Sequence, residues 1–363
     1  MIDLSVYQTK EDENLETEDK TVVGAINEVN GKTVDNIREI DLTNYDAQRI
    51  STANGLIWTD DTFFYMKDGE SFEKCVGKLS DDNSADITFN SNFRLASVTK
   101  QFIAFGIVKL INNGLLAYET CILDIYPDLP DYFKNITIKH LLNHTSGIYD
   151  YENMPHTDKQ ISDEDILVFL KTTNGTYFSP GDKYQYSNTA YILLGLIISK
   201  VSNQDLDEYI KSEVFSPALM DNSFVNYEGK TNVTERAYGH ILENNQLILK
   251  DQYWCSATIG DGGLYSSIND LKKWVKYLVT TNEFKAMKEP NLAGNYNEYG
   301  LGLRIISVNG KEIIYHSGST IGTKTLLLFS RDLKICLLFL TNFNDFNGTT
   351  LKEVLVEYLN IGA

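Results

Sequence analysis

The pattern of apolar and polar positions divides the chain into stretches of two kinds. Residues 55–76 and 300–340 show a period of two or short apolar runs, which predicts strands. Between Leu115 and Val279 apolar residues recur mostly at helical spacing, with long connections. Strands at both ends with helices between them predict an α+β fold. We expect one antiparallel sheet built from both ends of the chain, flanked by helices, with an inserted, mainly helical domain.

Two dipeptides give the sharpest local predictions. Asp68-Gly69 and Asn309-Gly310 each separate two strand-like runs and are typical of two-residue hairpin turns. The strands are expected at residues 62–67, 71–76, 300–307, 311–316, 324–329 and 334–340. Helices are expected at residues 101–111, 138–142, 163–171, 190–201, 206–214, 268–279 and 349–359.

These patterns also predict how the chain is divided. Residues 1–50 form an acidic N-terminal extension with a short amphipathic helix at residues 21–30. This extension packs on the main body or mediates self-association or assembly. The main domain is residues 51–363, divided into a sheet lobe and a mainly helical lobe, at residues 51–97 with 280–363 and at residues 98–279. Active sites commonly lie in the cleft between two such lobes.

Composition narrows the classes of partner. The 363 residues are 42% hydrophobic and 23% charged, as in an ordinary globular protein. The net charge of -18, with no basic run to offset it, excludes nucleic acid and anionic membrane as expected partners. No apolar stretch is long enough to span a bilayer.

The cysteines and the first residues bear on the compartment. The four cysteines are far apart and include no C-x-x-C pair, so we expect packed free thiols, with a disulfide as the alternative. The first residues lack the basic start and apolar core of a signal peptide. We therefore expect a cytoplasmic protein. Action outside the cell, on the cell wall, is the alternative if the sequence has been trimmed.

The first candidate for chemistry is Ser97-x-x-Lys100, directly ahead of the apolar run 101–111. If Ser97 opens that helix, its hydroxyl and the Lys100 amine lie on one face, one turn apart. A serine becomes a nucleophile when a neighbour takes its proton. A lysine in an apolar pocket can be that base itself, or it can lower the pKa of another base. Helix-start N–H groups favour an oxyanion. The alternative is a capping serine followed by a surface lysine.

Two later stretches add further polar groups. Tyr186-Ser187-Asn188 stands just ahead of the helix expected at residues 190–201, where Ser187 or Asn188 could simply cap the helix. Chemically, a tyrosine near a lysine can act as a base, and an asparagine can hold a substrate amide. The third stretch, at the end of a late strand, is His316-Ser317-Gly318-Ser319. Its small residues would let a substrate backbone lie along the strand edge, whereas a lone strand-end histidine is more often structural.

Ser-x-x-Lys, then Tyr-Ser-Asn, then His-x-Gly form an ordered set. In this set, and in the segments at residues 93–100, 138–147 and 260–267, the chain resembles the serine β-lactamase and penicillin-recognising superfamily. Specifically, it resembles the branch that holds class C β-lactamases, D-alanyl-D-alanine carboxypeptidases, D-aminopeptidases and related esterases. The resemblance covers residues 53–360 and implies a β-lactamase/transpeptidase-like fold.

The resemblance implies a role for each motif residue. Ser97 would be the acylated nucleophile of the SxxK motif and Lys100 its hydrogen-bonded partner. Tyr186 would be the general base, kept partly ionised by Lys100 and assisted by His316. Asn188 would orient the acyl amide of the substrate.

The resemblance also implies the surroundings of these groups. The oxyanion would be held by the backbone N–H groups of Ser97 and Ser319, beside the small residues Ser317 and Gly318. Neither metal nor cofactor is expected. His140 and His144 lack the glutamate of a zinc protease signature and are interpreted as structural.

The third motif differs from that of class C β-lactamases, which usually have lysine where this chain has His316. A histidine is only partly charged near neutral pH and holds a substrate carboxylate less firmly than lysine does. The resemblance therefore favours a hydrolase working through an acyl-enzyme: a serine peptidase for D-amino acids, carboxypeptidase-like, or an esterase or amidase for small molecules. The partner is a small-molecule or peptide substrate, with a β-lactam included. The alternatives are a class C-like β-lactamase and a non-catalytic structural or binding protein.

Overall fold

The structure is a computed structural model, and it describes residues 61–67, 70–75, 77–80, 83–156, 158–244, 246–289, 298–308, 310–332 and 335–343. The N-terminal extension and the helices expected at residues 21–30 and 349–359 lie outside these ranges. Antiparallel sheets combined with helices confirm the predicted α+β fold class.

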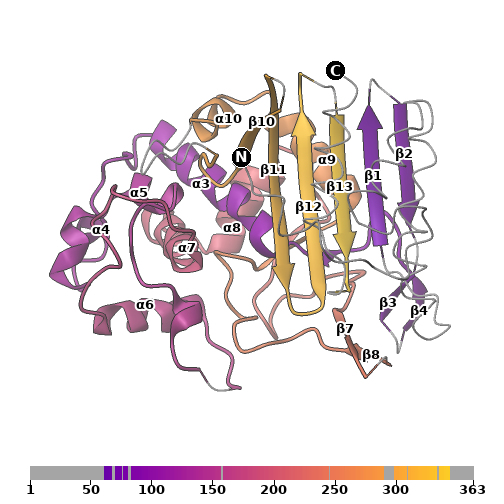
Figure 1. Cartoon of the computed structure of the whole chain (residues 1–363), viewed down its shortest axis with the longest axis horizontal. Helices are drawn as coiled ribbons and strands as arrows, with labels where there is room; N and C mark the ends of the chain where they lie inside the picture. Colours follow the sequence, from indigo (N-terminus) through magenta and orange to yellow (C-terminus); the bar gives the residue numbers. More distant parts are fainter. Residues whose placement is uncertain are drawn as a thin grey trace, which may run out of the picture.

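The main sheet is assembled from both ends of the chain (Figure 1). Within the described residues it has six antiparallel strands in the order β10-β11-β12-β13-β1-β2, so that β1 pairs with β13. The strands are β1 (Asp61–Lys67), β2 (Glu70–Cys75), β10 (Arg304–Val308), β11 (Lys311–Thr320), β12 (Thr323–Ser330) and β13 (Ile335–Thr341).

Both predicted hairpins are confirmed, since Lys67 pairs with Glu70 and Val308 pairs with Lys311. The strand expected from residue 300 begins later, at Arg304, because Gly302 has a φ of +72° and interrupts the extended backbone. Strand β11 continues beyond the predicted residue 316 to Thr320. This extension carries the third motif along a strand edge.

The helical predictions are largely confirmed within the described residues. The helix expected at residues 206–214 is the exception: it becomes a π-helical turn from Lys211 to Phe215. The helices are α3 (Thr99–Asn112), α4 (Ile122–Ile125), α5 (Ile138–Leu142), α6 (Asp163–Thr172), α7 (Asn188–Ser202), α8 (Leu206–Ile210), α9 (Ile268–Leu278) and α10 (Asn282–Met287). None of the described helices is long and apolar enough to cross a bilayer.

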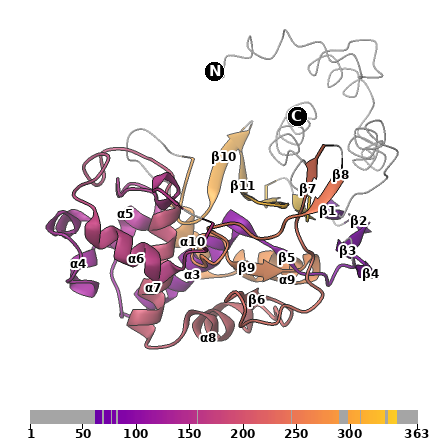
Figure 2. The same cartoon turned by 90° about the horizontal axis from the view of Figure 1, so that it is seen from below.

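Helix α3 lies at the centre of the molecule and is buried on nearly every side. In Figure 1, α4, α5, α6 and α7 gather on one side of it and the main sheet lies on the other. Figure 2 shows α3 and α9 beneath the sheet, where α9 contacts β13 and β1. The lobe boundaries remain a prediction, but the start of α3 does lie between sheet and helices.

Three smaller sheets were not predicted. One joins β5 (Phe93–Arg94), β9 (Leu264–Ser266) and β6 (Phe224–Val225). The others are hairpins: β3 (Lys78–Ser80) with β4 (Asn83–Asp86), and β7 (His240–Glu243) with β8 (Gln246–Leu249). The four cysteines are all free, as expected.

Candidate active site

Ser97 lies in a tight turn where sheet and helices meet. The turn is the 3₁₀ segment η3 (Ala96–Val98), which leads directly into α3. Ala96 has a φ of +46°, a sparsely populated conformation for a residue with a side chain, and such strain is often found at functional sites. The Thr325 hydroxyl donates to the Leu95 carbonyl at 2.8 Å and so ties the turn to β12.

Gly318 lets β11 approach this turn. A Cβ atom at residue 318 would overlap the Leu95 carbonyl oxygen and the Thr325 hydroxyl, and it would lie 3.1 Å from the Ala96 Cβ. A side chain therefore does not fit at this position unless β11 moves away from Ser97. The third motif needs its glycine for packing reasons as well as for access.

Lys100 is completely buried, and its ammonium group connects three segments. Its Nζ donates to Ser97 Oγ at 3.2 Å, to Asn188 Oδ1 at 2.7 Å and to the Asp261 carbonyl at 2.8 Å. All three ammonium hydrogens thus have acceptors, as a buried ammonium requires. The surface-lysine alternative for the first motif is excluded by this burial.

In the second motif, the adjacent residues Ser187 and Asn188 make different contacts. Ser187 is the N-cap of α7, with its hydroxyl accepting from Ala190 N at 3.2 Å. This leaves the Asn188 side chain to contact Lys100, while the Asn188 N–H donates to Asp150 Oδ2 at 2.6 Å. The Tyr186 ring centroid lies 5.0 Å from Lys100 Nζ. The Tyr186 hydroxyl is buried and has no bonding partner among the described residues.

His316 is almost completely buried, with a side chain that contacts two neighbours. Its Nδ1 lies 2.8 Å from the Ser317 carbonyl and its Nε2 lies 3.2 Å from the Tyr299 hydroxyl. The carbonyl can only accept, so Nδ1 carries the hydrogen and Nε2 accepts from Tyr299. The His316 and Tyr186 ring centroids are 6.3 Å apart, so the expected assistance to Tyr186 would act without a direct hydrogen bond.

The rest of the third motif follows an open strand edge. Strand β10 pairs with β11 only as far as Tyr315, so residues 316–320 have a strand beside them, β12, on one side only among the described residues. Gly318 is buried, whereas Ser319 is exposed and its hydroxyl accepts from Lys324 Nζ at 2.6 Å. That edge contacts η3, consistent with the expectation that the Ser97 and Ser319 N–H groups face one oxyanion.

Three residues of the site were missed in the sequence or interpreted otherwise. His144, expected to be structural, packs its ring against Tyr186 with centroids 4.3 Å apart. Tyr299 contacts His316, and the Arg304 guanidinium lies 5.5 Å from the Tyr186 ring and 5.6 Å from the Tyr299 ring. We call His144, Tyr299, Arg304 and His316 the imidazole cluster. Only His144, in the family-like segment 138–147, carried a sequence signal; the position of Arg304 depends on the strand register.

Burial and nearby positive charge act together on the two imidazoles. Desolvation, reinforced by Lys100 and Arg304, holds the pKa of His316 well below its usual range. The pKa of His144 is lowered for the same reasons, with His316 adding to the effect. Both rings are therefore neutral at neutral pH. The other histidine expected to be structural, His140, closes a capping box at the start of α5.

A second set of polar groups, Asp150, Tyr151, Asp163 and Asp261, lies along α7 and the loop at residues 259–261; we call it the carboxyl cluster. The Tyr151 hydroxyl donates to Asp261 Oδ2 at 2.8 Å. Asp163 accepts from Ile259 N at 2.8 Å and from Gly260 N at 3.0 Å, which holds the loop that presents the Asp261 carbonyl to Lys100.

The carboxyl cluster carries less negative charge than its composition suggests. Burial and the neighbouring Asp261 raise the pKa of Asp163 to about 8, against the two N–H bonds that lower it. Burial also raises the pKa of Asp150, again against N–H bonds, from Glu152 and Asn188. No described group of three or more His, Cys, Asp or Glu side chains has the arrangement of a metal site.

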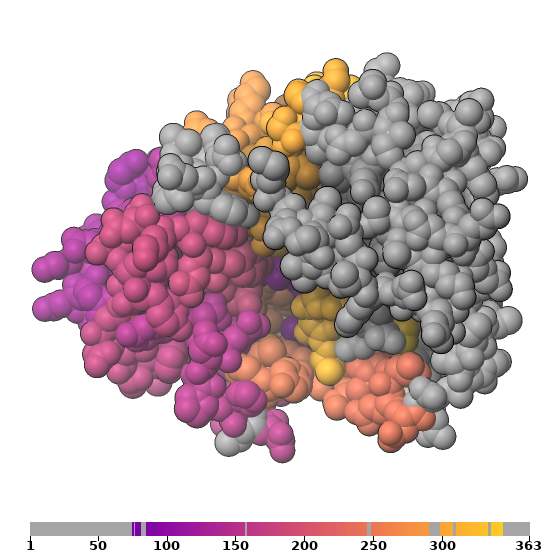
Figure 3. Space-filling view, in the orientation of Figure 1, coloured from indigo at the N-terminus to yellow at the C-terminus, as the bar shows by residue number. Residues whose placement is uncertain are grey.

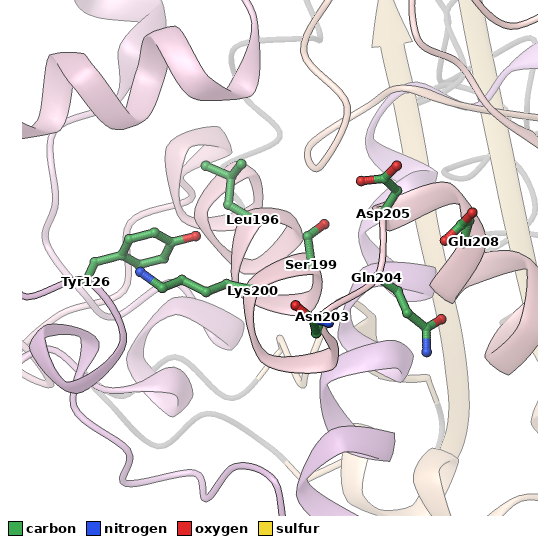
Figure 4. Close-up of a pocket in the computed structure, with 8 residues that line it drawn as sticks. All are labelled: Tyr126, Leu196, Ser199, Lys200, Asn203, Gln204, Asp205 and Glu208. Atoms are coloured by element: carbon green, nitrogen blue, oxygen red, sulfur yellow. The ribbon is translucent and has the colours of Figure 1, made fainter.

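The surface is hollowed between the helical part and the strands β11 and β12, as Figure 3 shows, and indigo residues of the first third of the chain form the floor there. A separate surface pocket of about 600 Å³ lies at the end of α7 and the start of α8 (Figure 4). It is lined by Tyr126, Ser199, Lys200 and Asp205 among others, and Lys200 Nζ lies 4.2 Å from the Tyr126 ring centroid. This pocket shares no residue with the three motifs.

Comparison with known proteins identifies the family of the chain. Residues 47–357 match the family model described as Beta-lactamase. Penicillin-binding protein 4* of Bacillus subtilis is 31% identical over 70% of this chain, and Protein flp of Staphylococcus aureus is 25% identical over 81%. The chain spans 61% of the length of each of these curated relatives.

Solved structures share the fold. The octameric penicillin-binding protein homologue from Pyrococcus abyssi superposes with a TM-score of 0.72 at 23% identity, covering 87% of this chain and 77% of that one. The D-amino acid amidase from Ochrobactrum anthropi SV3 gives 0.71 at 21% identity, covering 88% of this chain and 98% of the amidase. With the family match extending over most of its length, the chain belongs to the beta-lactamase family.

Proposed function

We propose that the protein is a serine hydrolase that forms an acyl-enzyme on Ser97. The observation that carries this proposal is the completely buried Lys100 ammonium, 3.2 Å from Ser97 Oγ and 2.7 Å from Asn188 Oδ1. Burying a charged lysine is costly, and a purely structural role would be served as well by an apolar side chain. A buried lysine bonded to a serine, which follows the strained Ala96 in a tight turn, is an arrangement suited to nucleophilic catalysis.

Each group then has a chemical task. Ser97 Oγ attacks the substrate carbonyl and forms the acyl bond, its proton passes to the Tyr186 oxygen, and that proton leaves on the departing amine or alcohol. Asn188 orients the acyl amide. The N–H groups of Ser97 and Ser319 stabilise the oxyanion, and removal of one such donor typically costs about 3 kcal/mol. Water then attacks the ester carbonyl and releases the acid and free Ser97.

The charges favour a small or peptidic substrate that carries a carboxylate. His316 is neutral at neutral pH, so it does not replace the lysine of class C β-lactamases as a fixed positive charge. Arg304, beside Tyr186, supplies a permanent positive charge at this end of the site. A D-amino-acid peptide is our preferred substrate class, since solved structures of the same fold include a D-amino acid amidase. Small esters and amides are the second class.

Mass spectrometry of the intact protein tests the nucleophile. After incubation with a fluorophosphonate, we expect one adduct on Ser97 and none in Ser97→Ala, with an unchanged melting temperature. Ser199→Ala is the matched control, because Ser199 lies in the separate surface pocket. Labelling of Ser97→Ala at the original rate would contradict the proposal and favour a non-catalytic role for the fold.

Incubation with penicillin separates the hydrolase types. A lasting adduct on Ser97 is expected for a peptidase, because its deacylation by water is slow. Rapid drug hydrolysis would assign a class C-like β-lactamase instead. Turnover of D- and L-amino acid amides and of a p-nitrophenyl ester, measured in parallel, then defines the acyl group.

A further inference from the structure

His144 holds the backbone on both sides of Tyr186. The Gln185 N–H donates to the His144 carbonyl at 2.9 Å, and the Ser187 N–H donates to His144 Nδ1 at 3.1 Å. Tyr186 is the residue between these two donors, so its backbone is fixed from both sides by a single residue. Hydrogen bonds on both sides of a residue restrict the movement of its backbone, and so fix the point from which its side chain extends.

The His144 ring also lies against the Tyr186 ring. The centroids are 4.3 Å apart with an interplanar angle of 37°, and Tyr299 closes in on His144 at 4.6 Å. His144 is completely buried and has a φ of +60°, in the left-handed region that side chains with a Cβ seldom adopt. Strain of this kind is kept where the surrounding structure imposes it, and it is concentrated at functional sites.

The protonation state of His144 follows from its contacts. Nδ1 accepts a hydrogen bond from a peptide N–H, so the single hydrogen of the neutral ring is on Nε2. Nε2 is buried without a bonding partner among the described residues.

We propose that His144 is a positioning residue for proton transfer: it fixes Tyr186 between Ser97 and the leaving group by binding both neighbouring peptides and covering one ring face. This inference rests on the proposed function, in which Tyr186 carries the proton. Among the described residues, no hydrogen bond joins His144 to the Tyr186 hydroxyl, so His144 would act through the position of Tyr186.

Charged neighbours keep this arrangement in place across neutral pH. Protonation at Nδ1 would remove the acceptor for Ser187, and burial together with nearby cations opposes that protonation. The titratable and charged groups around the two rings are Lys100 on α3, Tyr184 ahead of α7, Tyr191 on α7, Tyr299, Arg304 on β10 and His316 on β11.

Two substitutions separate the two contacts. His144→Asn keeps an acceptor at the position of Nδ1, and asparagine tolerates the left-handed backbone better than histidine does, but the ring is lost. We expect a lowered melting temperature, because a fully buried ring is lost, and a rate of fluorophosphonate labelling of Ser97 per folded molecule that is about 10- to 100-fold lower. His144→Phe keeps the ring and loses the acceptor for Ser187, so both stability and labelling rate should fall.

A double-mutant cycle with Tyr186→Phe tests whether His144 acts through Tyr186. In the Tyr186→Phe protein, itself slow to label, neither His144 substitution should slow labelling further. His140→Asn is the matched control: the His140 side chain closes the capping box of α5 by bonding to Thr137 N, so the labelling rate should not change. Labelling rates are compared per folded molecule. If one His144 variant is unstable, the other alone is sufficient for the cycle.

The outcomes distinguish this inference from the proposed function. A slow Tyr186→Phe protein combined with a His144→Asn protein that labels at the original rate would overturn the inference alone. The same holds if His144→Asn slows labelling by an equal factor with and without the Tyr186 hydroxyl, because His144 would then act independently. A Tyr186→Phe protein that labels at the original rate would overturn the assignment of Tyr186 as the base in the proposed function.

Discussion

The imidazole cluster and the carboxyl cluster respond to burial in opposite ways. In the first, burial and neighbouring cations lower the pKa values of His144 and His316, so that the bases are neutral. In the second, burial and a neighbouring carboxylate raise the pKa of Asp163 to about 8, so that an acid is largely neutral. The same desolvation thus removes one positive and one negative set of charges around Lys100.

As a result of these opposite shifts, only a few of the buried titratable groups in the two clusters carry charge at neutral pH. With the imidazoles and Asp163 neutral, the Arg304 guanidinium contributes a permanent positive charge next to the Tyr186 ring, and Lys100 Nζ lies 5.0 Å from the centroid of the same ring. The two clusters also impose opposite dependences of stability on pH. The imidazoles stabilise the fold above pH 6.5, their unfolded pKa, and this contribution is lost on acidification. The contribution of Asp163 is complete below pH 3.8 and is lost as the pH rises through about 8.

The largest expected effect comes from displacing β11, the strand that carries His316 of the imidazole cluster. Gly318→Ala places a Cβ atom against the Leu95 carbonyl and the Thr325 hydroxyl. Strand β11 must then shift away from Ser97, and displacement of catalytic groups by about 1 Å typically costs about 100-fold in rate. We expect such a loss in labelling of Ser97, with a lowered melting temperature. Gly310→Ala is a comparison at a φ of +73° without crowding, and it should leave labelling unchanged.

The second effect is a pH dependence of stability that comes from Asp163 in the carboxyl cluster. Between pH 5 and pH 7 the folded protein keeps a proton on Asp163 that the unfolded chain has lost, so wild-type stability falls as pH rises. Asp163→Asn lacks this dependence. The free energy of unfolding of the wild type, relative to the variant, should fall by about 1.4 kcal/mol per pH unit.

Urea unfolding of both proteins at pH 5, 6 and 7 measures this difference, and the histidine contributions cancel because both proteins have them. A constant difference across that range would show that Asp163 is ionised in the folded protein, as its two N–H donors alone would favour.

The smallest effect concerns the link between the carboxyl cluster and Lys100. Tyr151→Phe removes the hydroxyl that donates to Asp261 and leaves a buried acceptor unpaired. The free energy of unfolding should fall by about 1–3 kcal/mol. Tyr149→Phe, at a half-buried neighbour, is the matched control. Equal stability of the two variants would show that the hydroxyl of Tyr151 adds nothing to the cluster.

The sequence was most informative where one local signal dominates. The two hairpins followed from Asp68-Gly69 and Asn309-Gly310, and the buried α3 followed from its nearly continuous apolar run. The five motif residues were predicted because their order and spacing resemble those of a known family. In the structure their side chains lie near one another. Their chemical roles remain predictions.

Contacts between distant segments could not be read from the sequence. His144 looked structural because its environment depends on the path of residues 184–187. Arg304 reaches Tyr186 only through the register of β10 on β11, and Gly302 shortens that strand. The raised pKa of Asp163 depends on burial among loops that are remote from it in the chain. Local patterns contain none of this information.

The bond from Thr325 to the Leu95 carbonyl has a consequence for synthesis of the protein. A ribosome makes the turn that contains Ser97 long before it makes β11 and β12, which pack against that turn. The growing chain therefore contains Ser97 and Lys100 before it contains the strands that pack against their turn. In the proposed function, Ser97 therefore becomes a competent nucleophile only after β11 and β12 have been made and have packed against its turn.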